Sequence, residues 1–364
     1  MAKAIPAVLM RGGTSKGLFL HARDLPPPGP ARDALVLDLM GSPDPMQIDG
    51  LGGTHSSTSK VVVVEPGSGG DDVCYWFAQV GVDQPIVDWS GNCGNLTSAV
   101  GPFAVDEGLV EAVEPVTRVR MRNGNTGVRI LAEVPVRDGR ALAEGTHRIP
   151  GIRRPGAPVV TRYVGLGPCF PASAPAQELD GEDGPVEVTI LDVTHPYVFA
   201  RAEDLAVDLR DASPPALNQD GALLARVERL RGEAAVALGR AASPREAARL
   251  SPIVPRIVLV AEPADGDHHI AALGVSMGKI HHALPMTGAL CLAAAVRLPG
   301  TVPSGAARGV SGESVRVRHP RGVVEVLADV APAADPPVRS VGAIRTARRL
   351  MAGSVYAVDD GPAG

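Results

Sequence analysis

The stretch WSGNCGNLTSAVGPFAV, residues 89–105, places a cysteine between two Gly-Asn pairs and directly before an apolar run. Apolar residues from Leu96 to Ala104 recur at i, i+3, i+4, i+7 and i+8, which predicts one face of a helix. A second stretch, MTGALCLAAAVRL (286–298), is apolar nearly all round and predicts a helix buried inside a fold. Pro102 lies within the first pattern and is expected to kink or break that helix.

Short apolar runs rich in β-branched side chains recur between frequent turn residues, of which the chain has 42 glycines and 34 prolines. Their length and composition predict strands. The runs are AIPAVLM, SKVVVVEP, VTRVRMRN, VRILAEVP, VEVTILDV, RIVLVAEP, VRVRHPRG and GVVEVLADV. Surface helices are expected at 218–232 and 244–250, and the Pro/Gly-rich stretch 150–184 is typical of a linker or an edge between two halves.

Both halves of the sequence follow the same order of strands, polar loops and a Gly-rich approach to an apolar helix. The first half has RGGTSKG, GGTHSSTSK and SGNCGN, and the second has VTHPYVF and VSMGKIHHALPMTG. This layout predicts an α+β fold of two similar lobes, each with strands wrapped around one buried helix. Two helix N-termini would then face a cleft between the lobes and form a site for an anion.

The composition excludes several classes of protein. The 364 residues suffice for two domains with cores of their own, and a hydrophobic fraction of 45% is typical of a soluble globular protein. The net charge of −5, with no basic block, argues against a nucleic acid or a membrane surface as partner. No apolar run reaches the ~18 residues of a membrane span. No signal peptide is evident, so a cytoplasmic protein with free thiols is expected.

Cys93 is the first candidate for chemistry. If the helix begins near Gly94 or Asn95, the thiol lies at its N-terminus, a position that lowers a thiol pKa. Gly91 and Gly94 let the backbone come close to a ligand. The alternative is a small buried hydrophobe in a turn, and that interpretation is kept for the other three cysteines, Cys74, Cys169 and Cys291.

Lys60 is the second candidate, because it ends GGTHSSTSK and opens the strand VVVVEP. A lysine at the mouth of an apolar strand is partly desolvated, and desolvation and nearby cations both lower its pKa toward that of a general base. The alternative is a solvated lysine at a strand end. The serines and threonines from 54 to 59 either bind carboxylate oxygens or satisfy a tight turn.

Two Gly-rich loops carry further cations. MRGGTSKG offers Arg11 and Lys16 but is not a Walker A motif, because its spacing differs and Lys16 precedes glycine. SMGKIHHALPMTG offers Lys279, His281 and His282. Adjacent histidines on a strand point to opposite faces, and no Cys or His spacing suits zinc, so no metal is expected. Cations, one thiol, one base and two helix N-termini together suit an enzyme that moves a proton on a di- or tricarboxylate.

The motifs RGGTSKG, GLGGTHSSTSKVVVV, GNCGNLTSAVGPFAV and SMGKIHHALPMTGALCLAAAV, in this order, strongly resemble the PrpF family from about residue 5 to 358. HPRG at 319–322 looks like a fifth motif. The resemblance implies the fold of diaminopimelate epimerase, with two β-barrel-like lobes, each around a central helix, and an active site in the cleft between them. The implied lobes are 1–165, completed by 345–364, and 166–344.

By the same resemblance, Lys60 and Cys93 fall on the family's catalytic lysine and cysteine, and no cofactor is implied. The expected reaction is a cis-trans or double-bond-shift isomerisation of an aconitate-like acid. The partner is a small carboxylate, and a homodimer is a candidate assembly. Substrate contacts are expected from Arg11, Thr14, Ser15, Lys16, Ser57, Thr58, Ser59, Gly94, Asn95, Lys279, His281, Thr287, Gly288 and His319.

Three positions depart from the family pattern and bear on the choice of substrate. His195 stands where members usually have Asn, Arg321 stands where Ser is usual, and Pro285 is an extra proline near the second helix. A histidine adds bulk or charge, and an arginine adds a fixed cation for a carboxylate. The alternatives are that Arg321 is solvated and His195 stacks within its loop.

Two other functions compete with the isomerase. One is a keto–enol tautomerase for a 4-oxalomesaconate-like acid, which shares the acid–base chemistry. The other is a carboxylate-binding protein without activity, against which the presence of both Lys60 and Cys93 argues. Cys291 lies inside the second helix rather than at its mouth, so a two-thiol racemase is not expected.

Overall fold

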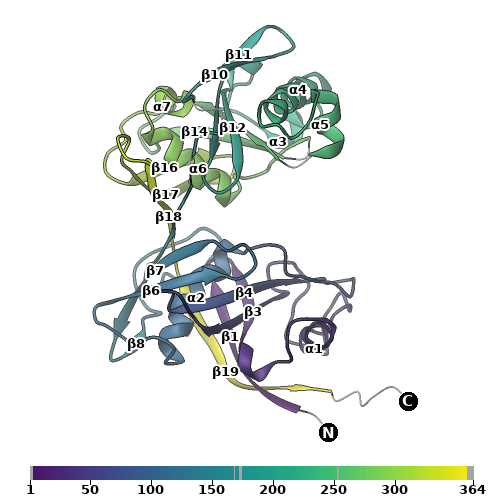
Figure 1. Cartoon of the computed structure of the whole chain (residues 1–364), viewed down its shortest axis with the longest axis vertical. Helices are drawn as coiled ribbons and strands as arrows, with labels where there is room; N and C mark the ends of the chain where they lie inside the picture. Colours follow the sequence, from purple (N-terminus) through teal and green to yellow (C-terminus); the bar gives the residue numbers. More distant parts are fainter. Residues whose placement is uncertain (1–2, 168, 172–173, 252–253, 277, 359–364) are drawn as a thin grey trace. The chain divides into compact units, whose positions relative to one another are not determined.

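The computed structural model describes residues 3–167, 169–171, 174–251, 254–276 and 278–358. The chain forms two compact units, shown in Figure 1. Unit 1 comprises Met1–Val164 and Ile344–Gly364, and unit 2 comprises Gly165–Ala343. Both ends of the chain therefore belong to unit 1. Within the described residues, no helix combines the length and the apolar character needed to cross a membrane.

Unit 1 is a strand-rich body with two principal helices. Its strands are β1 (Lys3–Gly12), β2 (Ser15–His21), β3 (Lys60–Pro66), β4 (Val73–Val80), β5 (Val87–Asp88), β6 (Val116–Asn123), β7 (Arg129–Arg137), β8 (Arg140–Ala141), β9 (Val159–Val164) and β19 (Ala347–Ala357). Its helices are η1 (Ala22–Asp24), α1 (Pro30–Met40) and α2 (Gly94–Asp106).

The four valines that follow Lys60 are buried on both faces of the sheet. Val62 and Val64 pack into the cluster around α2, whereas Val61 and Val63 pack into the cluster around α1. Successive side chains of a strand point to opposite faces, so a strand covered on both sides is a continuous apolar run. This double cover fixes the start of β3, and with it the position of Lys60.

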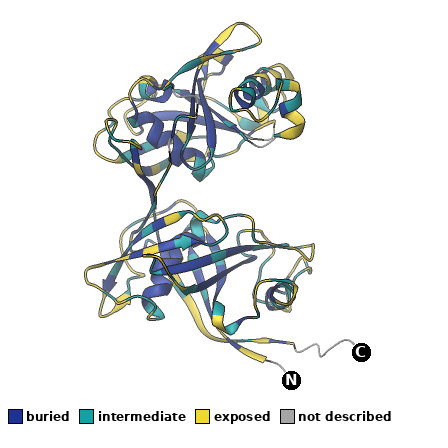
Figure 2. Cartoon of the chain, in the orientation of Figure 1, coloured by how far each residue is buried: buried dark blue, intermediate teal, exposed yellow. Residues whose placement is uncertain are grey.

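Helix α2 is the centre of unit 1. Its residues from Leu96 to Val105 are all buried, as Figure 2 shows for this helix. The predicted break at Pro102 does not occur, because α2 continues from Gly94 to Asp106. A proline removes one backbone hydrogen bond, but the burial of ten consecutive residues, Leu96 to Val105, keeps the chain helical on both sides of it.

The strands of unit 1 pair across long separations in the sequence. β1 lies between β2 and β19 and is antiparallel to both, with Lys3 opposite Ala357 and Gly12 opposite Ala347. β2 runs parallel to β3, β3 antiparallel to β4, and β4 parallel to β6. β6, β7 and β9 follow as antiparallel neighbours. Eight of these strands contribute side chains to the cluster around α2 (β1, β2, β3, β4, β6, β7, β9 and β19).

Unit 2 repeats this plan with additional helices. Its strands are β10 (Gln177–Asp180), β11 (Pro185–Asp192), β12 (Pro196–Arg201), β13 (Arg256–Ala261), β14 (Ile270–Ser276), β15 (Lys279–Ile280), β16 (Ser314–His319) and β17 (Gly322–Val330). β18 (Val338–Arg345) leads the chain back to unit 1. The helices are η2 (Glu203–Leu205), α3 (Pro214–Leu217), α4 (Gly221–Ala237), α5 (Pro244–Leu250), α6 (Met286–Arg297) and α7 (Val302–Ala306).

Helix α6 is the buried helix of unit 2, with every residue from Gly288 to Val296 inside. Helix α4 packs Leu223, Val227, Leu230 and Ala234 into a second cluster with strands β11 to β14. The predicted fold class, two lobes with strands around one buried helix each, is therefore confirmed.

The predicted surface helices differ in part from the structure. The helix expected at 244–250 is α5, whereas the one expected at 218–232 is α4, which begins at Gly221 and ends at Ala237. The Asp220 side chain caps it by accepting from the Leu223 N–H. The Pro/Gly-rich stretch 150–184 is not a linker throughout, because it contains β9 and β10. It does include the boundary between the two units, at Val164 and Gly165, as expected for an edge between two halves.

Candidate active site

Lys60 is buried at the first position of β3, with 7% of its surface exposed. Its Nζ donates a hydrogen bond to Gln79 Oε1 at 2.5 Å, and Gln79 is its direct partner on β4. The same Nζ lies 4.9 Å from the centre of the Phe77 ring. The ammonium group is thus held by a neutral amide and an aromatic face.

Burial lowers the pKa of Lys60 below its ordinary value, and the charge of Cys93 opposes that shift. The predicted direction is confirmed. The predicted contribution of nearby cations is not, because desolvation is the cause of the lowering. The interaction also shows that the two predicted catalytic residues lie close enough for their charges to act on each other.

Cys93 occupies the N-cap position of α2 and is partly exposed. Its Sγ lies 3.8 Å from Ser15 Oγ, and its carbonyl accepts from the Thr97 N–H at 2.9 Å and from Thr97 Oγ1 at 3.0 Å. The Cys93 side chain makes no cap hydrogen bond to the first turn of α2. Backbone N–H groups at such a helix start are free to bind an anion.

The turn between β1 and β2 lies against the first turn of α2. A Cβ on Gly12 would stand 2.4 Å from Asn95 O, and one on Gly13 would stand 2.1 Å from Asn95 Oδ1. Gly13 also has a φ of +50°, which favours glycine. Asn95 Nδ2 donates to Thr14 Oγ1 at 3.0 Å. The RGG of the first motif is therefore needed for this close approach.

Gly12→Ala is expected to destabilise unit 1, because the new Cβ meets the backbone of Asn95, which cannot move as a side chain can. Overpacking of this kind costs about 1–3 kcal/mol, a fall in Tm of roughly 2–10 °C. Gly91→Ala is the matched control, since a Cβ there has no atom within 4 Å. Thermal unfolding of both variants tests this, and equal Tm values would show that the turn does not pack as described.

Arg11 and Lys16 hold the same turn in place. Arg11 Nη1 donates to Thr346 O at 2.6 Å, Thr346 Oγ1 at 2.9 Å and Gly13 O at 3.1 Å. The backbone N–H of Lys16 donates to Ser57 O at 3.0 Å. Ser15 is buried between them. These contacts give Arg11 a structural role in the turn, and its contact with substrate stays a prediction.

The residues before Lys60 form a tight turn that satisfies its own polar groups. Thr58 Oγ1 donates to His55 O at 3.0 Å. The Ser59 hydroxyl is fully buried and accepts from Gln47 Nε2 at 2.7 Å. Of the two interpretations of this stretch, the turn is what these contacts support for Thr58 and Ser59. Ser57 is half-buried and remains a candidate for substrate binding.

Two tyrosines near Cys93, Tyr75 and Tyr163, have no signal in the local sequence pattern. Tyr75 of β4 bonds through its hydroxyl to Thr97 Oγ1 at 3.0 Å and to Asn92 Oδ1 at 3.3 Å. Burial raises the pKa of Tyr75 to about 12 and also raises that of Tyr163, and a charge on Cys93 contributes to both shifts. Both phenols therefore stay protonated and neutral at neutral pH.

In unit 2, the start of α6 carries Thr287 and Gly288. Thr287 Oγ1 lies 2.9 Å from the Tyr197 hydroxyl, and Thr287 O accepts from Thr194 Oγ1 at 3.1 Å. A Cβ on Gly288 would stand 3.1 Å from the Tyr197 ring. The N-cap is Pro285, which makes no side-chain hydrogen bond to the helix. The extra proline thus defines where α6 begins.

His195 is neutral rather than cationic. Burial, and then the charge of Arg256, lower its pKa to about 4. Its ring lies 4.7 Å from that of Tyr197, and its buried Nε2 has no hydrogen-bond partner among the described residues. Of the two effects weighed for His195, bulk or charge, the lowered pKa favours bulk at neutral pH. The two rings are tilted by 37° to each other, so His195 packs against Tyr197 of β12 without stacking on it.

The other candidates of unit 2 lie on or directly after two strands, with Lys279 on β15 and His319 at the end of β16. Lys279 is exposed, and His281 Nδ1 lies 2.8 Å from Ala283 O. His319 Nδ1 accepts from the backbone N–H of Arg321 at 3.1 Å, and burial, followed by the charge of His281, lowers the His319 pKa. The side chain of Arg321 is exposed, as the solvated alternative has it.

Cys291 does not resemble Cys93. It is fully buried within α6, where its thiol lies 3.5 Å from Leu191 O. Burial raises the pKa of Cys291, so this thiol is inert at neutral pH. This agrees with the expectation that the chain is not a two-thiol racemase.

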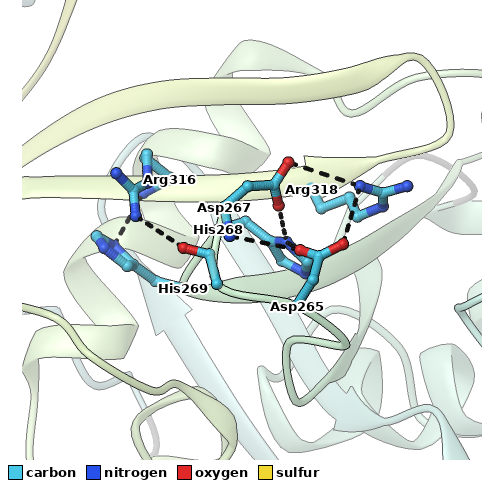
Figure 3. Close-up of polar contacts among 7 residues, drawn as sticks. Asp265, Asp267, His268, His269, Arg316 and Arg318 are labelled. Atoms are coloured by element: carbon cyan, nitrogen blue, oxygen red, sulfur yellow. Dashed lines mark hydrogen bonds and ion pairs between the residues drawn. The ribbon is translucent and has the colours of Figure 1, made fainter.

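A polar cluster of unit 2 lies in the loop between β13 and β14 (Figure 3). Its residues are not among those predicted for the site. His268 Nδ1 lies 2.5 Å from Asp267 Oδ1 and 2.9 Å from Asp265 Oδ1. In the described part of the chain, these three form the one group of His, Cys, Asp or Glu close enough to hold a metal ion. Arg318 Nη1 approaches both carboxylates, at 3.8 and 3.9 Å, and supplies positive charge there.

Comparison with known proteins finds relatives along the whole chain. The family model "PrpF protein" matches residues 2–358. A 3-methylitaconate isomerase from Eubacterium barkeri is 38% identical and aligns over 97% of each chain. A 2-methyl-aconitate isomerase from Shewanella oneidensis is 40% identical over 88% of each chain. A 4-oxalomesaconate tautomerase from Pseudomonas putida is 37% identical over 96% of this chain and 95% of that one. The crystal structure of methylitaconate-delta-isomerase matches with a TM-score of 0.91 and 37% identity, covering 98% of this chain and 96% of that one.

Proposed function

The chain belongs to the PrpF protein family of isomerases, and we propose that it moves a proton on an unsaturated di- or tricarboxylic acid, with Lys60 and Cys93 as the acid–base pair. The observation that carries this proposal is the pairing of a buried amine of lowered pKa with a half-exposed thiol at a helix N-terminus. Burial without a carboxylate partner favours the neutral form of a lysine, and a neutral amine can act as a general base.

The proposed reaction begins at a C–H bond next to the conjugated carboxylate. The neutral Lys60 amine takes this proton, and the electron pair of the C–H bond spreads into a dienolate whose charge rests on the carboxylate oxygens. The Cys93 thiol then gives its proton to a carbon of the conjugated system. At the end, Lys60 has gained a proton and Cys93 has lost one. Proton exchange with solvent returns both groups to their starting states. The roles of Lys60 and Cys93 can also be reversed.

The developing charge on the carboxylate needs fixed donors, because such a C–H bond is a very weak acid. The N–H groups at the start of α2 would serve as these donors, and the turn of Gly12 and Gly13 packs against that start. Preorganised hydrogen-bond donors of this kind often account for a large part of the rate acceleration by an enzyme. The motif that holds Cys93 would thus also hold the carboxylate beside the reacting carbon.

A dienolate would allow one site to give several products. Rotation about its weakened double bond gives cis-trans isomerisation, as required for a 2-methylaconitate substrate. Reprotonation at another carbon gives a shifted double bond, as required for a 3-methylitaconate substrate. The second candidate is a keto–enol tautomerase for a 4-oxalomesaconate-like acid, since a relative of this name matches nearly the whole chain.

A screen of unsaturated di- and tricarboxylates by proton NMR tests the proposed function. The expected result is conversion of an aconitate- or itaconate-like acid without any added cofactor. Conversion of keto acids alone would favour the tautomerase. Binding of these acids without conversion would favour a carboxylate-binding protein without activity.

Dialysis against EDTA is expected to leave kcat unchanged, because the acid–base pair supplies both proton transfers. The metal content of the protein should be measured before and after, since Asp265, Asp267 and His268 could bind an ion in unit 2. Activity that falls on dialysis and returns with a divalent ion would contradict a metal-independent mechanism.

A further inference from the structure

Gln79 is the one hydrogen-bond acceptor that the described residues offer to Lys60 Nζ. Lys60 of β3 and Gln79 of β4 lie opposite each other in the sheet, and Lys60 Nζ lies 2.5 Å from Gln79 Oε1. The lysine is buried from solvent. A buried ammonium without a partner is costly, so this single acceptor decides where the amine lies.

The orientation of the Gln79 amide is set by the backbone. Its Nε2 donates to Ser59 O at 2.9 Å and to Ser56 O at 3.1 Å. A flipped amide would turn its oxygen toward these carbonyls, so the oxygen must face Lys60. Ser59 is itself held by Gln47. The acceptor is therefore rigid before any substrate binds.

The neutrality of Gln79 matters as much as its geometry. No carboxylate of the described residues lies within 4.0 Å of Lys60 as an ion-pair partner, and the other contact of Nζ is the Phe77 ring. A carboxylate would hold a proton on the amine. An amide oxygen fixes the amine but leaves it able to release that proton.

We propose that Gln79 is the positioning residue for Lys60, which keeps the amine in place through both protonation states by means of a locked, uncharged acceptor. This inference rests on the proposed function for its role in catalysis, but the contact itself can be tested without turnover. Gln79 acts through Lys60 and is not assigned any contact with substrate.

Two isosteric variants, Gln79→Glu and Gln79→Met, make opposite predictions. The carboxylate of Gln79→Glu favours the ammonium, so the acid limb of the kcat/KM profile moves up by about 1–3 pH units. Gln79→Met removes an acceptor from the ammonium, so the limb moves down by about one unit. Displacement of the amine should also lower the maximal kcat of Gln79→Met roughly 10- to 100-fold. The titratable group whose charge acts on Lys60 is Cys93, and both variants leave it in place.

A titration by NMR gives the readout that does not depend on activity. Four of the 35 basic residues are lysines, Lys3, Lys16, Lys60 and Lys279, so ¹³C-labelled lysine gives only four side-chain signals. Lys60→Arg identifies the signal of Lys60. Gln84→Glu is the control, because it adds the same charge at an exposed position after β4.

Opposite shifts of the Lys60 midpoint in Gln79→Glu and Gln79→Met, with none in Gln84→Glu, are the expected result. Unchanged midpoints, or shifts of both variants in one direction, would overturn the positioning role. Loss of kcat in both variants without any change in the pH profile would show a structural role only. If the wild-type protein converts no polycarboxylate, the proposed function fails while the titration still decides the contact.

Discussion

Lys60→Ala is expected to lower kcat by roughly 100- to 10,000-fold, the range of general acid–base contributions, while the protein stays folded. The amine is buried, faces only neutral partners, and has a lowered pKa. Steady-state rates on the acid identified by the screen measure the loss. A circular dichroism spectrum and a Tm close to those of the wild type show that the fold is intact.

Lys60→Arg is the matched control, because arginine keeps the positive charge but cannot be deprotonated in a protein. The proton-transfer role predicts that this variant is as inactive as Lys60→Ala. If Lys60→Arg keeps near-normal kcat, Lys60 binds the substrate as a cation and is not the base.

The lowered pKa of Lys60 also has a consequence for stability. Between that lowered pKa and the ordinary 10.5, the unfolded chain binds more protons than the folded protein. Stability therefore rises with pH through this window, and Lys60→Met should flatten that rise. Urea unfolding at several pH values measures the slope.

Cys93→Ser is expected to lower kcat by a similar order of magnitude, roughly 100- to 10,000-fold. A serine hydroxyl keeps the size and the hydrogen-bonding capacity of the thiol but is a far weaker acid. The N-cap position also tolerates serine well, so the fold and α2 should be preserved. Rates and Tm, measured as for Lys60→Ala, check both parts of this expectation.

Cys74→Ala serves as the control for Cys93→Ser, because Cys74 is buried in β4 and burial raises its pKa. Among the four cysteines only Cys93 is partly exposed, so iodoacetamide should label it first and abolish activity. Protection of Cys93 by substrate would place the thiol at the site. A fully active Cys93→Ser would show that the thiol does not transfer the proton.

Much of the fold follows from local pattern. The valine run after Lys60 predicts a strand, and the periodicity of Leu96 to Ala104 predicts α2, although Pro102 wrongly predicts a break within it. Strand β19 has no such pattern, because seven of its eleven residues are exposed. Its pairing with β1 joins residues more than 300 positions apart, and only the completed sheet stabilises it.

In the candidate site, too, some residues are marked by the local sequence and others are brought in only by the fold. The motifs around Lys60 and Cys93 mark these two residues, since reactive side chains at a strand start and a helix start can be recognised from neighbours in the sequence. Gln79 and Tyr75 lie on β4 and reach the site only through strand pairing, so no local pattern marks them. The neutral state of His195 depends on burial, which the sequence around it does not specify.

Proton NMR of the reaction in heavy water tests the central claim most directly. The substrate identified by the screen is incubated with the wild-type protein, Lys60→Ala and Cys93→Ser, and deuterium is located in the substrate and in the product. If one group removes a proton and another returns one, wild-type product carries solvent deuterium at the newly protonated carbon. Both variants should then lose isomerisation, and loss of exchange at the C–H position of the substrate identifies the variant that lacks the base. With Lys60 as the base, that variant is Lys60→Ala. Wild-type product that retains all of the substrate hydrogen, or variants that still form labelled product at wild-type rates, would contradict proton transfer by Lys60 and Cys93.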